Sequence, residues 1–462
     1  MRIKVWLSIL LCISMLAGCS FSADGPLRLS RRTDGNSLGL APDFSYTYEE
    51  QTPNILLNQI GYQPDGSKVA LFQGKQLDSS YVIYNADSGN IVFTGTLREA
   101  PIAGNAEEEK DYLYLADFSQ LTREGRFYLF HKNLGYSDEF FIKEDPYEQL
   151  ESHLLKQLAL ENRDTASLCY QLAGLLLTLE LYSGQIQDVE EVHRILQEKI
   201  ELLGRAQDEE TGSVYEVIPE AQNLHTKSGQ TEGETSSAQP ISLAATAEYA
   251  GVMAMYACYI QNTDRQLAKQ CQMRAEKAFA SIAGSLDNVS FDAGYFAVSQ
   301  LYKKTLRPTY AQAIGQYLAM QEEQKSYTVY DFTLFGDYAY LTGKQGINLE
   351  WSRQLMNKVM KQAEEISLTA GRENYYVSNK RELYDVEGML QDTSVMALVN
   401  YVITNHEYSS LLGNYLDYFL GRNPQARCLV EGFGARNMPE GQEESVGKSH
   451  MALLYLLLQS RK

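Results

Sequence analysis

Leu416-Asp-Tyr-Phe-Leu-Gly-Arg-Asn-Pro424, followed by Glu431-Gly-Phe-Gly434, is the stretch of this 462-residue sequence that decides the fold. Its first half completes a segment, Tyr408 to Leu420, in which apolar residues recur at intervals of three and four. That period is typical of a helix with one buried face. The stretch therefore stands near the end of a chain that we expect to be helical from Pro146 onward.

The same period recurs in nine other segments of this region. They are Leu150 to Ala159, Cys169 to Tyr182, Val189 to Leu203, Ala244 to Tyr259, Gln266 to Ile282, Tyr310 to Met320, Glu350 to Ile366, Thr393 to Thr404 and Lys448 to Leu458. About ten helices with long loops, such as 208–242, predict an α-helical toroid or a solenoid. No short sequence repeat distinguishes the two.

Between Ile55 and about Ile142 the pattern changes to short runs rich in β-branched and aromatic residues. Gly, Asp, Asn and Pro separate these runs at the spacing of strands in a small β-sandwich. The runs include Lys68 to Phe72, Tyr81 to Tyr84, Asn90 to Phe93, Tyr112 to Leu115 and Arg126 to Phe130. We therefore expect a β-sandwich domain over 54–144 and a helical domain over 145–462.

The N-terminal residues predict export. A basic start and the apolar run Val5 to Leu16 have the length of a signal peptide and are too short for a membrane-spanning helix. The run ends in Leu16-Ala-Gly-Cys19, which resembles a bacterial lipobox, so we expect residues 1–19 to be a signal peptide and Cys19 to be acylated. Residues 20–53, rich in Ser, Gly, Asp and Arg, predict a flexible tether. The expected location is the outer face of a bacterial membrane, with the membrane contacted through this lipid anchor.

Charge and cysteine content narrow the function classes. The formal charge of −19, without a basic block after the N-terminus, argues against nucleic acid as a partner and leaves neutral glycans open. The cysteines after residue 19 are Cys169, Cys258, Cys271 and Cys428. Their even number permits two disulfides, but their spacing matches no disulfide scaffold, and Cys258 and Cys271 are expected to be small buried groups of helices. There is no CxxC pair and no HExxH motif, so no metal site is predicted.

Several motifs resemble one family, in the family's order. Ile55-Leu-Leu-Asn-Gln-Ile-Gly-Tyr62 is similar to the opening strand of the Ig-like domain that precedes many cellulases of glycoside hydrolase family 9. Pro240-Ile-Ser-Leu-Ala-Ala-Thr-Ala-Glu-Tyr-Ala250 resembles a helix entry of that family, and the stretch from Leu416 to Gly434 closely matches its Leu-Asp-Tyr-Leu-Leu-Gly-Arg-Asn-Pro and Gly-Phe-Gly signature. The resemblance implies an N-terminal Ig-like β-sandwich followed by an all-α (α/α)₆ barrel that handles polysaccharide.

The resemblance also states which catalytic residues to expect. Inverting hydrolysis needs a carboxylic acid that protonates the glycosidic oxygen and a carboxylate that activates water on the opposite sugar face. Glu444 aligns with the family's general acid, although Lys448, Ser449 and His450 replace the residues expected behind it. The family's base comes from an Asp-Ala-Gly-Asp-Tyr loop, and this loop is missing here. Asp164 is the only aspartate in the corresponding segment and is a weak candidate base.

Other sugar-contacting elements of the family are altered. Asp292-Ala-Gly-Tyr295 with Phe296 corresponds to a later family helix, where Ala293 replaces Glu and Phe296 replaces Trp. We expect Asp292, Tyr295 and Phe296 to line the substrate groove. The family's Tyr-Gly-Ser-Asn element is here Tyr384-Asp-Val-Glu387, and Trp351 is the only tryptophan after the predicted signal. Many relatives bind calcium, so the resemblance leaves calcium open, but no calcium site and no other cofactor is identified.

Three functions are compatible with these residues. The first is a family 9 protein that binds β-glucan or a related exopolysaccharide, with lost or much reduced endoglucanase activity. The second is a divergent β-glycan hydrolase that uses Glu444 as general acid and an unrecognised base such as Asp164. The third is a non-catalytic structural partner of polysaccharide-assembly proteins. Fold alone does not decide among them, because activity depends on the site.

Overall fold

The computed structural model describes residues 53–100, 112–220, 240–320, 327–343, 348–378, 385–403, 406–438 and 445–461. Cys19, the predicted tether up to residue 52 and Glu444 lie outside the described residues. None of the described helices is both long and apolar enough to cross a membrane.

The first described part consists of short strands in two antiparallel sheets. One sheet has the order β1-β2-β6-β5, and the other has the order β4-β3-β7-β8 with β9 paired to β7. The strands are β1 (Ile55–Leu56), β2 (Val69–Gln73), β3 (Ser80–Asn85), β4 (Ile91–Thr96), β5 (Arg98–Glu99), β6 (Leu113–Asp117), β7 (Gly125–His131), β8 (Gly135–Tyr136) and β9 (Phe140–Ile142). The predicted strand runs fall on β2, β3, β4, β6 and β7.

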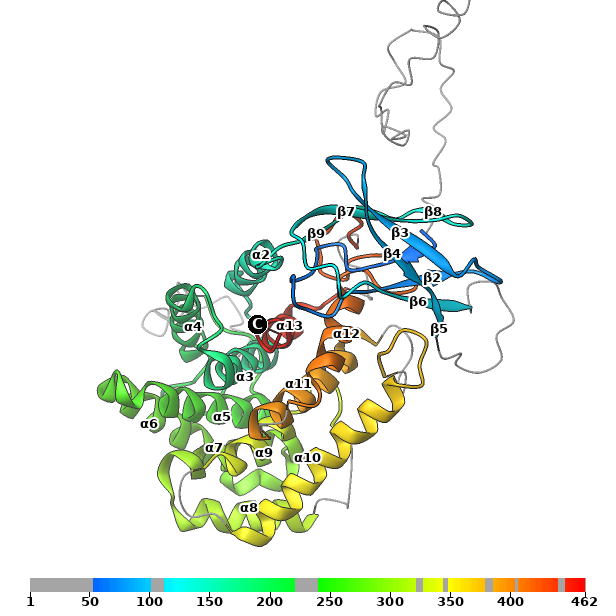
Figure 1. Cartoon of the computed structure of the whole chain (residues 1–462). Coiled ribbons are helices and arrows are strands. Elements are labelled where there is room, and N and C mark those ends of the chain that lie inside the picture. Colours follow the sequence, from blue (N-terminus) through cyan, green and yellow to red (C-terminus); the bar gives the residue numbers. More distant parts are fainter. Residues whose placement is uncertain are drawn as a thin grey trace, which may run out of the picture. The chain divides into compact units, whose positions relative to one another are not determined.

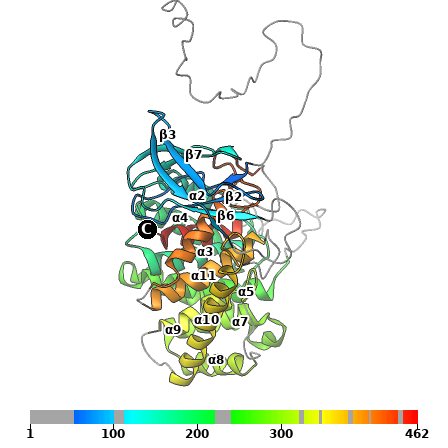
Figure 2. The same cartoon turned by 45° about the vertical axis from the view of Figure 1, so that its right-hand side comes forward.

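The β1-β2-β6-β5 sheet buries side chains on both faces. Along β2, Ala70 and Phe72 pack into a core shared with the other sheet, whereas Leu71 between them belongs to the core of the helical part. Leu56 in β1 also joins the helical core. Successive side chains of a strand point to opposite faces, so this alternation means that one face covers the sandwich and the other covers the helices. In both views the sheet with β2 and β6 lies on the side of the helices (Figures 1 and 2).

Twelve α-helices follow among the described residues. They are α2 (Glu148–Ala159), α3 (Thr165–Tyr182), α4 (Val189–Gly204), α5 (Leu243–Tyr259), α6 (Arg265–Ile282), α7 (Phe291–Thr305), α8 (Pro308–Met320), α9 (Thr333–Leu341), α10 (Leu349–Ala370), α11 (Val386–Val402), α12 (Ser409–Phe419) and α13 (Met451–Gln459), the last preceded by the 3₁₀ turn η5 (Lys448–His450). The ten helices predicted from periodicity are present, and α7 and α9 are additional.

The helices alternate between an inner and an outer ring. Every residue of α13 is buried, and α3, α5, α7, α9 and α11 are buried almost all round. By contrast α4 buries a single stripe, which consists of Val192, Ile195, Leu196, Lys199, Ile200 and Leu203. Helix α3 packs on α5, α5 on α7 and α7 on α9, while α11 packs on α13 and α13 returns to α3. Figure 1 shows α4, α6 and α8 at the periphery. This is the predicted (α/α)₆ arrangement.

Polar contacts also join the strands to the helical part. Asn58 Nδ2 donates to Asp417 Oδ1 at 2.9 Å, and Gln59 Nε2 donates to the carbonyl of Ala426 at 2.8 Å. Arg436 Nε lies 2.8 Å from Asp138 Oδ2. The described residues within Thr52–Ala86 and Ile91–Lys462 accordingly form one compact unit. The exact domain limits, 54–144 and 145–462, stay a prediction.

The four described cysteines are free thiols. Cys169, Cys271 and Cys428 are buried, and Cys258 is partly buried. Burial raises the pKa of each thiol, to about 11 for Cys258 and Cys271. They therefore behave as small apolar groups of the core, as predicted for Cys258 and Cys271.

Candidate functional site

The N-terminal turns of the inner helices meet at one end of the helical part. Asp385 caps α11 by accepting a hydrogen bond from the backbone N–H of Gly388 at 2.8 Å, and this places Glu387 in the first helical turn. The start of a helix carries a partial positive charge, which favours a carboxylate there. The side chain of Glu387 is 32% exposed, so it is open to a ligand.

Glu387 is held by residues from two other helix starts. His450 Nδ1, from η5, lies 3.2 Å from Glu387 Oε1, and the hydroxyl of Tyr330, from the segment before α9, donates to the same oxygen at 3.4 Å. Ser449 Oγ lies 2.8 Å from the Tyr330 hydroxyl and 3.1 Å from His450 Nδ1. The contact with His450 holds the pKa of Glu387 below its usual value, although partial burial acts in the opposite direction. Glu387 is therefore an ionised, oriented carboxylate at neutral pH.

Tyr330 presents an aromatic face beside this carboxylate. The residue is 45% exposed, and its φ of 59° lies in the left-handed region that residues other than glycine seldom adopt. Its ring contacts that of Tyr170 from α3 and packs edge-on against the buried His450 ring, with centroids 4.5 Å apart. Such backbone strain persists only where the surrounding contacts fix it, and it is common at ligand-binding sites.

Further carboxyl groups lie at the same end. Asp292, in the first turn of α7, accepts a hydrogen bond from the backbone N–H of Phe332 at 3.3 Å. Glu248 of α5 is 7% exposed, and burial, aided by the charges of Asp292 and Asp164, raises its pKa to about 8. Burial also raises the pKa of Asp331. Glu248 is thus protonated and Glu387 ionised at neutral pH, the combination that acid–base chemistry requires. Glu248 Oε2 is fully enclosed, however, and so cannot touch a ligand in this conformation.

Asp164 serves as the N-cap of α3. Its Oδ1 accepts a hydrogen bond from the backbone N–H of Ser167 at 2.7 Å, and the side chain is otherwise exposed. Helix α2 ends at Ala159 and α3 begins at Thr165, so the connection has only the residues 160–164. The sequence of this connection contains no counterpart of the family's Asp-Ala-Gly-Asp-Tyr loop.

The other predicted site residues divide into two groups. Asp292 is partly exposed at the site, but Tyr295 and Phe296 are 0% exposed, which corrects the expectation that their rings line the groove. Tyr295 stacks on Phe291, while Phe296 packs on Phe332 and lies against Gly251. Their helix is buried on nearly all sides, so both rings belong to the core. Glu444, the predicted general acid, lies outside the described residues.

Four residues of this site were not predicted as functional: Tyr330, Glu387, Ser449 and His450. Three of them, Glu387, Ser449 and His450, stand at positions where the sequence departs from the family pattern. The structure brings the two departing segments into contact through the Glu387–His450 pair. The sequence did carry one signal for these residues. Two separate motifs both depart from the family pattern, and residues of the two motifs could contact each other. Among the described residues, no group of three or more His, Cys, Asp or Glu is arranged to hold a metal ion.

Comparisons with known proteins agree with this architecture. Residues 50–135 match the model "Cellulase N-terminal ig-like domain", and residues 162–446 match the model "Glycosyl hydrolase family 9". Similar solved structures include Bacteroides ovatus GH9, with a TM-score of 0.72 and 17% identity over 88% of this chain and 98% of that chain. Another is a metagenome-derived glycoside hydrolase family 9 endoglucanase, with a TM-score of 0.68 and 19% identity over 83% of this chain and 86% of that chain. At these identities the likeness shows the fold.

Among characterised proteins, Endoglucanase D of Acetivibrio thermocellus is 35% identical over 94 residues. That match spans 20% of this chain and only 14% of the relative, so it concerns a small part of that protein. The family 9 model, in contrast, covers more than half of this chain. The chain therefore belongs to glycosyl hydrolase family 9.

Proposed function

We propose that this chain is an exported, lipid-anchored glycan-binding protein that holds β-glucan or a related exopolysaccharide, with endoglucanase activity lost or much reduced. The observation that carries the proposal is the five-residue connection from α2 to α3, combined with the accessible Tyr330–Glu387 pair at the same end of the helical part. The first feature argues against efficient hydrolysis. The second offers a place for a sugar.

The short connection weakens hydrolysis because it supplies no separate base. Its one aspartate, Asp164, already accepts a hydrogen bond as the cap of α3. Loss of a general base typically costs about 10²–10⁴ in rate. The altered sugar contacts reduce transition-state binding further.

Binding can persist without that base. Tyr330 exposes part of its ring, and Glu387 offers an ionised carboxylate that accepts hydrogen bonds from sugar hydroxyls. An apolar face with a few fixed polar groups is the usual composition of a small-ligand site. A millimolar Kd corresponds to about −4 kcal/mol, which one ring contact and a few hydrogen bonds can supply.

The test combines binding and turnover on soluble β-glucans. Calorimetric titration with cello-oligosaccharides should show weak binding that Tyr330→Ala and Glu387→Gln each weaken about tenfold. Tyr136→Ala and Glu210→Gln alter exposed residues elsewhere and should leave the Kd unchanged. A reducing-sugar assay on carboxymethylcellulose and mixed-linkage glucan should show little or no product. Binding that is insensitive to both site variants would place the glycan elsewhere.

A divergent hydrolase is the second candidate, because Glu387 is an ionised carboxylate whose pKa is lowered chiefly by His450. Under that alternative Glu444 donates the proton to the leaving oxygen, with Asp164 or Glu387 as base. Robust hydrolysis by the wild type that Glu444→Gln abolishes would replace the binding proposal with this one. If neither turnover nor binding is measured, the remaining function is that of a structural partner in surface polysaccharide assembly.

The membrane anchor is tested separately. We expect the wild-type protein to fractionate with membranes. The Cys19→Ala variant should move to the soluble fraction, because it lacks the thiol that carries the lipid. A Cys19→Ala variant that still fractionates with membranes would show that the anchor lies elsewhere.

A further inference from the structure

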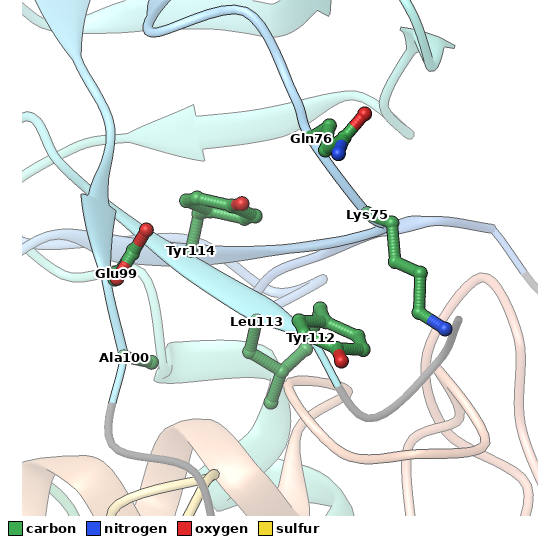
Figure 3. Close-up of a pocket in the computed structure, with 7 residues that line it drawn as sticks. All are labelled: Lys75, Gln76, Glu99, Ala100, Tyr112, Leu113 and Tyr114. Atoms are coloured by element: carbon green, nitrogen blue, oxygen red, sulfur yellow. The ribbon is translucent and has the colours of Figure 1, made fainter. Parts of the chain in front are cut away.

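A cavity of about 450 Å³ lies at the edge of the β1-β2-β6-β5 sheet. Its size falls within the range of small-molecule sites. Figure 3 shows its lining, which consists of Lys75, Gln76, Glu99, Ala100, Tyr112, Leu113 and Tyr114. These residues belong to strands and turns of the Ig-like part, so the cavity is separate from the Tyr330–Glu387 site on the helix starts.

The turn after β2 shapes one end of this cavity. Gln76 has a φ of 52°, and Gly74 has a φ of 153°, both in the region that favours glycine. The backbone N–H of Gly74 donates to the carbonyl of Tyr112 at 3.0 Å and ties the turn to the start of β6, the strand that pairs with β2. Lys75 Nζ then lies over the Tyr112 ring, 4.9 Å from its centroid. The ammonium group is therefore held at the cavity wall by a cation–π contact.

The strands shape the other end. In the register of β5 and β6, Glu99 stands directly opposite Tyr114. Neighbouring side chains of such a pair lie on the same face of the sheet. Leu113, on the other face, and Ala100 are buried in the core shared with the helices and add apolar lining. The side chains of Glu99 and Tyr114 are therefore neighbours on one face of the sheet.

The chemistry of this lining indicates an uncharged ligand. Lys75 and Glu99 carry opposite charges, so the formal charges of the lining cancel and favour neither an anion nor a cation. Lys75 donates hydrogen bonds, Glu99 accepts them and Gln76 does both, which suits a ring that bears several hydroxyl groups. Tyrosine rings supply the apolar surface against which the C–H face of a pyranose packs.

We propose that this cavity is a second sugar-binding site, which takes one or two units of an uncharged hexopyranose chain. The choice of ligand rests on the proposed function, whereas the location does not. A chain held at two places on one molecule gains affinity from the effective concentration of the second contact. The Ig-like part would then act as a glycan-binding module in its own right.

The experiment measures cellotetraose binding to the purified full chain by calorimetry, in the wild type and in a Glu387→Gln background. Tyr114→Ala and the double variant Lys75→Ala/Glu99→Ala should each weaken the binding that remains in this background about tenfold. Lys75 and Glu99 are exposed, so the double variant keeps the test valid if Tyr114→Ala fails to fold. The matched control, Lys132→Ala/Glu139→Ala, removes two exposed charges from turns beside the other sheet and should not change the Kd. A glucosamine tetrasaccharide, which has the same linkage and carries positive charge, should bind no more tightly than cellotetraose.

The outcomes separate the two sites. If Glu387→Gln abolishes all binding and the cavity variants change nothing, the second site is refuted while the proposed function stands. If the cavity variants abolish binding and Glu387→Gln has no effect, the cavity is the glycan site and the helix-start site is refuted. Tighter binding of the charged tetrasaccharide would overturn the assignment to an uncharged sugar, and no binding of any oligosaccharide would overturn both proposals.

Discussion

At the scale of single residues, two carboxyl groups of this chain have pKa values shifted in opposite directions by different causes. His450 contacts Glu387 and lowers its pKa, whereas enclosure in the protein raises the pKa of Glu248. The first group is accessible and the second is not. Glu387 is therefore suited to ligand contact, while Glu248 affects the pH dependence of stability.

The raised pKa of Glu248 predicts that the fold loses stability as pH rises. The pKa changes from 4.5 to about 8 on folding, so between these values the unfolded chain has released a proton that the folded chain retains. For this group the free energy of unfolding should fall by about 1.4 kcal/mol per pH unit in that window. Glu248→Gln is neutral in both states and should lack this fall. Urea unfolding at pH 6 and pH 8 measures it, with the exposed Glu210→Gln as control, and parallel pH dependences of wild type and Glu248→Gln would contradict the assignment.

The site could be predicted only in part from the sequence. Asp164 and Asp292 were predicted from the family resemblance, because each lies in a short segment that corresponds to a family motif. Tyr330, Glu387 and His450 come from three segments far apart in the chain, and their contact arises only when the starts of α9, α11 and α13 meet. The resemblance placed the ring of Phe296 in the groove, and periodicity could not correct this, because a helix buried all round has no polar face that would mark the opposite face as core.

At the scale of elements, the same reason explains what periodicity missed. Helix α10 has a polar face and Asn348 as its cap, and the sequence predicted it within a few residues. Helix α9 has nine residues, nearly all buried, so it shows no amphipathic period. The first turns of α11 were missed similarly, since its buried residues begin at Val386. Strands β5 and β8 have two residues each, too few for an alternating pattern.

Close packing of α5 on α7 predicts a large effect at one glycine. A Cβ on Gly251 would lie 2.3 Å from a ring carbon of Phe296, which is itself fully buried. Gly251→Ala should lower the free energy of unfolding by about 1–3 kcal/mol, because the ring must leave its position in a filled core. Thermal unfolding followed by circular dichroism measures the change. Gly284→Ala, where an added Cβ meets nothing within 4 Å, is the matched control, and an equal effect of the two substitutions would refute the packing argument.

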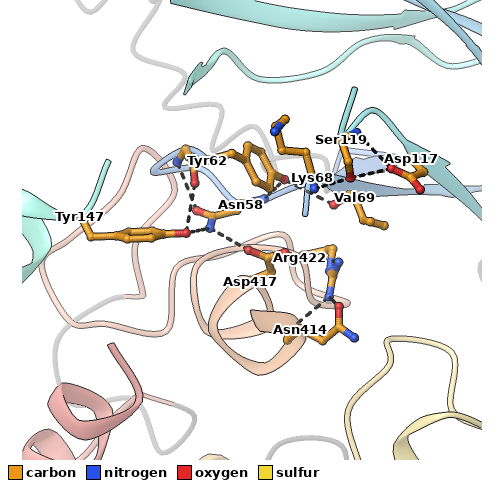
Figure 4. Close-up of polar contacts among 11 residues, drawn as sticks. Asn58, Tyr62, Lys68, Val69, Asp117, Ser119, Tyr147, Asn414, Asp417 and Arg422 are labelled. Carbon is orange, nitrogen blue, oxygen red and sulfur yellow. Dashed lines mark hydrogen bonds and ion pairs between the residues drawn. The ribbon is translucent and has the colours of Figure 1, made fainter. Parts of the chain in front are cut away.

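At the scale of the whole molecule, the Ig-like and helical parts share a core and a buried polar network. Asn58 lies between Asp417 and Tyr147, and Arg422 contacts Asp417 from the other side (Figure 4). Burial raises the pKa of Asp417, while Arg422 and Asn58 act against this rise. The strand side thus supplies a hydrogen bond that a buried carboxyl group of the helical side needs.

Removing that hydrogen bond should destabilise both parts together. Asn58→Ala leaves Asp417 without its 2.9 Å partner and should cost about 1.5–3 kcal/mol, the usual contribution of a hydrogen bond to a charged group. Asn133→Ala removes an exposed turn contact, with the backbone N–H of Asp78, and should stay within about 0.5 kcal/mol. Chemical unfolding followed by two probes, tyrosine fluorescence and helix content, checks the prediction. Transitions of the two probes that do not coincide would contradict joint unfolding of the two parts.

The shared core predicts a single cooperative unfolding transition for residues 53–461. Leu56 and Leu71, on the face of the sheet that covers the helices, belong to the same hydrophobic cluster as residues of α3 and α13. Separating the two parts would therefore expose apolar surface on both. Scanning calorimetry should therefore show one transition whose calorimetric and van't Hoff enthalpies agree. Limited proteolysis should first remove residues before 54 and should not cut cleanly at 143–150, because the chain passes from β9 to α2 with almost no linker. Two calorimetric transitions, or two stable halves after cleavage at 143–150, would mean that the strand-rich part folds as an independent module.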